Sequence, residues 1–413
     1  MPRPAGDIPL LFTTRIVRLF CYGFLSVVLA LYLSQAGLNE KLIGLLFTLT
    51  LAGDAGISLW LTTSADRFGR RRTLVAGAFL MVGAGAVFIF TRNPFLLMAA
   101  AIIGVISPSG NEIGPFLSVE QAGLTQLVPD ARRTQTFAWY NLSGSFATAT
   151  GALAGGWLSQ VLQGGGMPAI DSYRVVLAGY ALGGLALVVI FLFLSDRVEV
   201  GQGTDPAHRP PQGTLLGLQR SRWVVLRLSG LFALDAFAGG LVVQSMVAYW
   251  FHVRFGVEPG IIGSIFFGAN VLAGFSALLA GRLARRIGLI NTMVFTHVPS
   301  NLLLMLVPLM PSLPLAIAAL LARFSTSQMD VPTRQSYTMA VVAPDERSAA
   351  SGVTTVARSV GAAISPSLTG IFLSVSGLLS LPFFLAGGLK LIYDLLLFRS
   401  FRRLKPPEER STP

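Results

Sequence analysis

The chain has 413 residues, of which 53% are hydrophobic and 12% are charged, and its formal net charge is +12. A soluble protein of this length carries about 25% charged residues, so the composition excludes an ordinary soluble domain and favours an all-α membrane protein. The single Cys21 excludes an internal disulfide framework, and the three histidines form no metal-ligand pattern, so we expect no metal and no cofactor.

Apolar runs of roughly 20 or more residues follow one another along the whole chain. Because a helix of about 20 residues crosses the hydrocarbon core, we predict twelve transmembrane helices. The fourth, fifth, tenth and eleventh runs are longer, and we expect tilts or kinks in them at Pro108, Pro115, Pro332 and Pro366. The predicted spans are 14–36, 41–64, 73–91, 95–128, 133–162, 172–194, 226–252, 260–282, 290–310, 313–342, 347–373 and 377–399.

The stretch 198–222 breaks this pattern, because it is rich in glycine and proline and has no apolar periodicity. We interpret it as a cytoplasmic linker between an N-terminal six-helix half, 1–197, and a C-terminal half, 223–400, which a tail, 401–413, follows. By our count, 23 of the 31 Lys and Arg residues lie on the side of the termini and the linker. The positive-inside rule therefore predicts a multi-pass protein of the inner or plasma membrane with both termini in the cytoplasm.

The two predicted halves resemble each other in sequence. Residues 44–69 align without gaps on 263–288, which places Gly69 opposite Gly288. A second echo pairs VPDAR at 128–132 with APDER at 343–347. A chain that repeats at half its length is built from two similar units, so we predict two pseudo-symmetric halves.

A charged segment, ADRFGRRRT, follows the second span and contains Asp66, Arg67, Gly69 and Arg70. Twelve spans divided by a polar linker, with D-R-x-G-R-R between the second and third, resemble the major facilitator superfamily over nearly the whole chain. The chain departs from the family pattern at Thr62, where a glycine is usual, and at Ala152, where a proline is usual in drug–proton antiporters.

This resemblance implies a secondary active transporter, not an enzyme, whose halves rock to expose a central cavity lined by spans 1, 4, 7 and 10. It also implies a cytoplasmic gate formed by Asp66, Arg67, Gly69 and Arg70, with Asp66 near the amino end of span 11, where unpaired N–H groups stabilise a carboxylate. The expected partners are a small-molecule substrate, protons and membrane lipids, with no nucleic acid, and we expect a monomer. A nucleotide-binding loop of the G-x-x-x-x-G-K-S/T kind is absent from the sequence.

Ionisable side chains inside the spans are the candidate site residues, because each costs about 2.5–3.5 kcal/mol to insert without a partner. Arg334 either binds an anionic group of the substrate or neutralises Asp330, four residues earlier. Glu120 either carries a proton or is permanently paired with an arginine across the interface of the halves. The substrate-binding candidates are Asn111, Glu112, Arg323, Asp330 and Arg334, the proton-coupling candidates are Glu112, Glu120, Asp54 and Asp235, and Arg358 is a buried structural or switch charge.

Two further pairs follow from position. Asp235 can pair with Arg15 or Arg18, and Lys390 with Asp394 at i, i+4 in the last span. The predicted function is proton-coupled export of a small organic compound by alternating access. A proton-coupled importer on the same fold, or a non-transporting membrane sensor, are the alternatives. The sequence does not identify the substrate.

Overall fold

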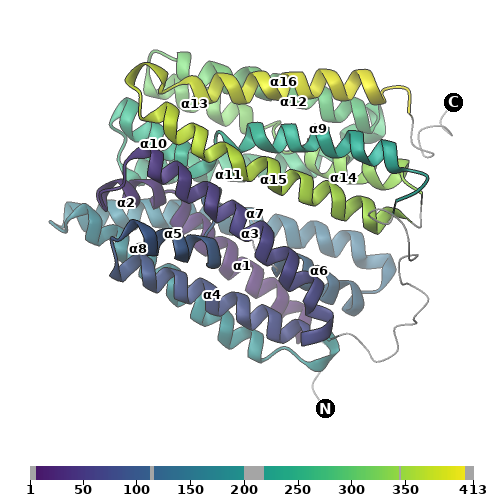
Figure 1. Ribbon diagram of the computed structural model, residues 1–413, viewed down its shortest axis with the longest axis horizontal. Helices are drawn as coiled ribbons and strands as arrows, with labels where there is room; N and C mark the ends of the chain where they lie inside the picture. The colour runs from purple at the N-terminus through teal and green to yellow at the C-terminus, as the bar shows by residue number, and fades with distance from the viewer. Residues whose placement is uncertain (1–5, 112–115, 200–217, 344–345, 405–413) are drawn as a thin grey trace. The chain divides into compact units, whose positions relative to one another are not determined.

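A computed structural model describes residues 6–111, 116–199, 218–343 and 346–404, without the side chains at 61–67, 130, 131, 134 and 348. Within these ranges the regular structure is helical throughout (Figure 1). Nine of the helical stretches found there are long and apolar enough to cross a membrane. The all-α membrane fold is therefore confirmed, and the count of twelve spans stays a prediction.

The helices of the first half of the chain follow one another with short connections. They are α1 (Asp7–Ser26), α2 (Leu29–Gln35), α3 (Glu40–Phe68), α4 (Arg70–Phe90), α5 (Pro94–Ile103), α6 (Phe116–Leu127), α7 (Asp130–Gly164), α8 (Ala169–Leu192) and the 3-10 turn η1 (Asp196–Val198). The second half contains α9 (Arg222–Gly240), α10 (Gln244–Phe255), α11 (Pro259–Ile287), α12 (Leu289–Leu306), η4 (Val307–Leu309), α13 (Leu313–Phe324), α14 (Asp330–Val341), α15 (Arg347–Leu373), η6 (Ser376–Leu378) and α16 (Leu381–Phe401).

Four of the predicted spans are broken into two helices each, and the breaks recur at matching places in the two halves of the chain. The first span divides into α1 and α2, and the seventh into α9 and α10. The fourth divides into α5 and α6 around Pro108, and the tenth into α13 and α14. Pro332 lies in the first turn of α14, where backbone N–H groups have no partner within the helix, so a proline costs no hydrogen bond there. The helix α15, in contrast, continues through Pro366. Discontinuous helices are typical of transporters, in which they line the binding site.

The aligned glycines of the internal repeat adopt the same backbone conformation. Gly69 precedes α4 with φ of 96°, and Gly288 precedes α12 with φ of 86°. Side chains other than glycine rarely adopt a positive φ of this size, so both turns require the glycine that the sequence supplies. The alignment of the two halves thus marks a repeated tight turn between consecutive helices.

Contacts between residues divide the chain into two compact units. The first comprises 1–204 and 243–271, and the second comprises 205–242 and 272–413. In the first unit α1 packs on α7 and α4 packs on α8, and in the second α9 packs on α15 and α12 packs on α16. Figure 1 shows α16 and α12 running side by side.

Apolar side chains both fill the units and cover their exteriors. The core of the second unit contains Phe232, Met293 and Tyr393, all at most 2% exposed. Phe90 and Phe95 are 86% and 81% exposed, as expected of side chains that face lipid. Glycines allow close helix contact in the first unit, where a Cβ added to Gly151 would lie 2.1 Å from the Phe20 carbonyl oxygen.

Candidate functional site

The second unit contains a buried cluster of charged side chains centred on Asp235 of α9. The Asp235 side chain is 6% exposed and contacts cations from three other helices. Lys390 Nζ of α16 lies 2.6 Å from its Oδ1, while guanidinium nitrogens of Arg334 from α14 and Arg358 from α15 lie 3.0 Å and 3.4 Å from its Oδ2. One carboxylate therefore joins four helices through ion pairs.

Arg334 is shared between two carboxylates. The same guanidinium nitrogen lies 3.0 Å from Asp235 Oδ2 and 3.0 Å from Asp330 Oδ2, and the Arg334 side chain is 7% exposed. The guanidinium also lies over the ring of Phe232, 5.4 Å from its centroid. Of the two predicted interpretations of Arg334, this geometry favours charge neutralisation, extended from Asp330 to Asp235.

Asp394 of α16 is a further buried carboxylate, and a histidine and an amide from α12 contact it. His297 Nδ1 of α12 lies 2.9 Å from Asp394 Oδ1, and Asn301 donates a hydrogen bond of 3.0 Å to Asp394 Oδ2. His297 Nε2 faces the central carboxylate, 3.9 Å from Asp235 Oδ1. Lys390 makes its ion pair with Asp235, so the predicted pairing of Lys390 with Asp394 is not the arrangement observed.

Two arginines of this unit are not fully used by the cluster: Arg358 is partly exposed, and Arg323 has a buried N–H group without an acceptor in the described residues. The Arg358 side chain is 35% exposed, which differs from the prediction that it is buried against another helix. Arg323 is half-buried on α13 and interacts electrostatically with Asp235 and Asp330, and its Nε has no hydrogen-bond partner in the described residues. The described cluster thus contains four cations and three carboxylates. The cations are Arg323, Arg334, Arg358 and Lys390, and the carboxylates are Asp235, Asp330 and Asp394.

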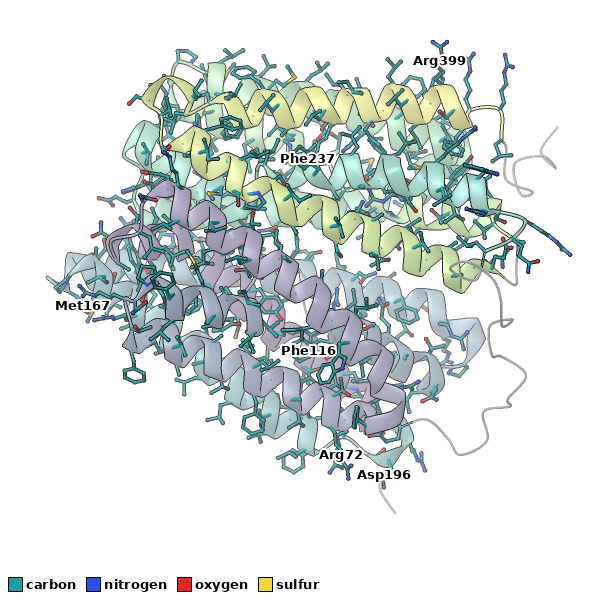
Figure 2. All side chains as sticks on the ribbon, in the orientation of Figure 1. Arg72, Phe116, Met167, Asp196, Phe237 and Arg399 are labelled. Carbon is teal, nitrogen blue, oxygen red and sulfur yellow. The ribbon has the colours of Figure 1, made fainter. Side chains whose placement is uncertain are left out.

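The first unit contains a separate buried ion pair. Arg18 of α1 donates to both oxygens of Glu120 of α6, at 2.7 Å and 2.8 Å, and both side chains are 0% exposed. Thr14 and Tyr140 also donate to this carboxylate. Phe116, labelled in Figure 2, lies under the Arg18 guanidinium with 4.6 Å between carbon and ring centroid.

This arrangement decides between partners that the sequence left open. Glu120 is paired with an arginine of its own unit rather than with one across the interface of the halves. Asp235 is paired with Lys390, Arg334 and Arg358, so the predicted pairing with Arg15 or Arg18 is wrong. Arg15 instead donates to Asn141 at 3.2 Å.

The charged segment between α3 and α4 contacts a carboxylate that the sequence did not single out. Backbone N–H groups of Arg70 and Arg71 donate to Glu199, at 2.7 Å and 3.0 Å, so this carboxylate caps the amino end of α4. A Cβ at Gly69 would lie 3.3 Å from Glu199 Oε1. The side chains of Asp66 and Arg67 lie outside the described part of the chain.

A second carboxylate, that of Glu346, lies outside the predicted spans and caps the start of α9. Glu346, in the APDER repeat, accepts from the backbone N–H groups of Gln219, Arg220 and Ser221 before α9, at 2.5, 2.8 and 2.8 Å. Burial raises the pKa of Glu346, but these hydrogen bonds outweigh it and lower the pKa to about 2. The carboxylate therefore holds the entrance of α9 while it is ionised.

Two more of the predicted residues, Asn111 and Asp54, lie in the described part of the chain. Asn111 is exposed, and its carbonyl accepts a hydrogen bond from Ser107 in the break between α5 and α6. Asp54 is half-buried on α3 and accepts from Ser58 at 3.1 Å. Glu112 lies outside the described residues.

The breaks of three helices meet inside the first unit. Ser245 at the start of α10 donates from its hydroxyl to the carbonyl oxygens of Ser26 and Pro108, at 2.6 Å and 2.7 Å. Gln244 donates to the Ser26 hydroxyl and accepts from Asn270. Backbone groups that a broken helix frees must be satisfied inside a membrane, and these side chains supply the partners. Gln244 therefore ties helices together.

Sequence reasoning missed His297, Arg18 and Glu199 as site residues. His297 is a lone histidine in an apolar span, and its partner Asp394 lies 97 residues further along the chain. The available signal was indirect: intramembrane charges are costly, so Glu120 and Asp394 each needed a donor from another span.

Helices long enough to span a membrane, broken in matching places and carrying buried ion pairs, define a polytopic membrane protein. The sequence profile of the Major Facilitator Superfamily matches residues 11–366 and 254–413. The chain therefore belongs to the Major Facilitator Superfamily, whose members are transporters and not enzymes.

Related proteins agree with this assignment. The chain is 32% identical to the uncharacterized membrane protein YJR124C of Saccharomyces cerevisiae. The alignment extends over 417 residues and covers 95% of this chain and 93% of that protein. A bacterial homolog of the human lysosomal transporter Spinster, inward-facing and occupied, is similar with a TM-score of 0.74 and 15% identity, covering 98% of this chain and 99% of that one. A D-xylose–proton symporter has a TM-score of 0.72 and 15% identity, with coverage of 95% and 97%. At these identities the solved structures show the fold alone.

Proposed function

We propose that this secondary transporter couples the movement of a small organic compound to protons and exports that compound by alternating access between its N-terminal half, 1–197, and its C-terminal half, 223–400. One observation carries the proposal: Asp235, a buried carboxylate, is shared by cations from α14, α15 and α16. A group that joins four helices changes partners whenever those helices shift, so its charge state and the packing of the unit depend on each other.

The physical argument is an exchange of partners. Removing charge from one member of a buried network leaves the others uncompensated, which is expensive in a medium of low dielectric constant. Binding or release of one proton in the cluster therefore favours one arrangement of helices over another. Among the proton-coupling candidates, Asp235 lies within this cluster, whereas both oxygens of Glu120 are occupied by a buried arginine.

Of the predicted substrate-binding residues we retain Asn111, Glu112 and Arg323, because Asp330 and Arg334 neutralise each other. Arg323 is the member that carries an unused buried donor, and a guanidinium binds a carboxylate or phosphate through parallel hydrogen bonds. We therefore propose that the compound carries an anionic group. The segment of Asp66, Arg67, Gly69 and Arg70 is proposed as the cytoplasmic gate, and its turn is held by Glu199.

The test uses purified protein in liposomes that contain the pH indicator pyranine. A panel of organic acids, amino acids, sugars and organic amines is added outside, with empty liposomes as the control. Proton-coupled transport predicts that at least one compound changes the internal pH in the presence of the protein only. If compounds cross without any change of internal pH, coupling to protons is wrong.

Direction and topology need separate measurements. Accumulation in inverted vesicles but not in right-side-out vesicles, under the physiological pH gradient, is expected of an exporter, and the opposite result identifies an importer. We propose a plasma or inner membrane location with both termini in the cytoplasm. In a Cys21→Ser background, cysteines added at either terminus should react with an impermeant reagent only after the membrane is opened.

A further inference from the structure

His297 lies between two buried carboxylates in the second unit. Its Nδ1 is 2.9 Å from Asp394 Oδ1 and its Nε2 is 3.9 Å from Asp235 Oδ1. The ring is 5% exposed, and the two aspartate side chains are 1% and 6% exposed. Histidine is the side chain that ordinarily gains and loses a proton between about pH 5 and 8. Each ring nitrogen therefore has an acceptor to which it can present a proton.

The contacts of Asp394 decide which nitrogen carries the proton in the neutral ring. Asn301, one turn beyond His297 on α12, donates to Asp394 Oδ2 at 3.0 Å, so α12 contacts both oxygens of this carboxylate. The ring is further fixed edge-on to Tyr393, with 5.9 Å between centroids. A carboxylate held in this way orients Nδ1–H toward itself and leaves the lone pair on Nε2 for the incoming proton.

Charged groups from several helices surround Asp235, the carboxylate that His297 Nε2 faces, so protonation of His297 affects more than one contact. Asp235 comes from α9, Lys390 and Asp394 from α16, and Arg358 from α15. Two further members act through Asp235: Arg334 with its partner Asp330 on α14, and Arg323 on α13. Lys390 Nζ and His297 Nε2 face the same atom, Asp235 Oδ1, at 2.6 Å and 3.9 Å. A protonated His297 therefore competes with Lys390 for one oxygen.

We propose that His297 is the proton-binding residue of this transporter and that Asp394 and Asn301 are positioning residues that reserve Nε2 for the proton. The proton arrives from water on one side of the membrane, binds the Nε2 lone pair, and leaves Nε2 for water on the other side. While bound, it directs Nε2–H at Asp235 Oδ1 and weakens the Lys390 pair, which links α9 to α16. This inference rests on the proposed proton coupling and adds the group that binds the proton.

The first test observes the histidine itself and needs no substrate. The chain has three histidines, so nitrogen-15 labelling of histidine gives few signals in NMR spectra. Replacing His208 and His252 by Gln leaves the His297 signal alone. We expect the Nδ1–H tautomer in the neutral ring, conversion to imidazolium as the sample is acidified, and loss of the tautomer preference in Asp394→Asn. A ring that stays neutral down to pH 5, or that carries its proton on Nε2, overturns the proposal.

The second test measures coupling. Liposomes with wild type, His297→Gln or His252→Gln receive the compound that changed internal pyranine fluorescence with the wild type. His252 is the matched control, because its Nδ1 lies 2.9 Å from a backbone carbonyl, that of Val257, rather than from a carboxylate. We expect His297→Gln to lower gradient-driven accumulation at least tenfold while it retains exchange across the membrane, and His252→Gln to match wild type.

The outcomes separate two failures. If wild type itself shows no accumulation driven by the pH gradient, proton coupling is wrong, whatever the variant does. If wild type and His297→Gln accumulate the compound equally, coupling stands and the assignment to His297 is overturned. If His297→Gln does not fold, the titration and the Asp394→Asn variant decide, because neither requires that variant.

Discussion

Replacing Asp235 by Asn should destabilise the second unit mainly through Lys390. The change removes the partner of three cations, but these differ in what remains. Arg334 keeps Asp330 at 3.0 Å, and Arg358 is 35% exposed to its surroundings. Lys390 is 9% exposed, and the nearby Asp394 is already engaged by His297 and Asn301. Breaking a buried ion pair by removing one partner costs about 3–5 kcal/mol, and we assign most of it here to the ammonium.

Two double variants test which cation accounts for the loss of stability. Asp235→Asn with Lys390→Met removes the uncompensated ammonium and should recover most of the lost stability, since a buried pair replaced by apolar groups is often neutral. Asp235→Asn with Arg358→Met should recover little. Thermal unfolding of the purified protein at pH 7 measures all four proteins, and the single variant should unfold at a temperature lower by ~6–20 °C. Equal recovery in both double variants, or a silent single variant, would refute the reasoning.

Three other changes test the remaining contacts. Glu120→Gln should lower the unfolding temperature strongly, because leaving Arg18 buried without a carboxylate costs about 3–5 kcal/mol of stability. An unchanged melting curve would show that the pair contributes nothing. Gly69→Val should slow transport with the protein still inserted, since a side chain is strained at φ of 96° and its Cβ would crowd Glu199, and wild-type turnover would contradict this. Glu346→Gln should lower the unfolding temperature at pH 7 by ~2–4 °C, for about 1 kcal/mol of lost capping, and a difference that persists at pH 2 would contradict it.

The pH dependence of the Glu346 contribution has a definite sign. The folded protein lowers the pKa of Glu346 to about 2 from its usual value near 4.5. A lowered folded pKa means that the contribution is complete above the unfolded pKa and is lost as the pH falls through the folded pKa. The two proteins should therefore differ at pH 7 and converge between about pH 4.5 and 2.

Much of the fold follows from local properties of the sequence. Run length and composition predict membrane helices, and the glycine at position 69 predicts a turn that recurs at Gly288. The proline at position 108 correctly indicated where the fourth span breaks. The break of the first span, at Val27 and Val28, carries no glycine or proline, so no local signal marked it.

The partners within the site could not be predicted in the same way. A buried carboxylate requires a donor, and the sequence supplies several arginines at similar depth in different spans. Glu120 selects Arg18, which lies 102 residues away, because α1 and α6 belong to one unit. Spacing on one helix favoured Lys390 with Asp394, yet the packing of α9 beside α16 gives Lys390 a nearer partner in Asp235.

The most direct test of proton coupling is the balance point of transport. In liposomes held at zero membrane potential, one pH unit should balance an about tenfold gradient of the compound if one proton is exchanged for each molecule. We predict that net flux vanishes at that ratio and reverses sign on either side of it. If net flux vanishes only when the compound is at equal concentration on both sides, whatever the pH gradient, the protein does not couple its substrate to protons.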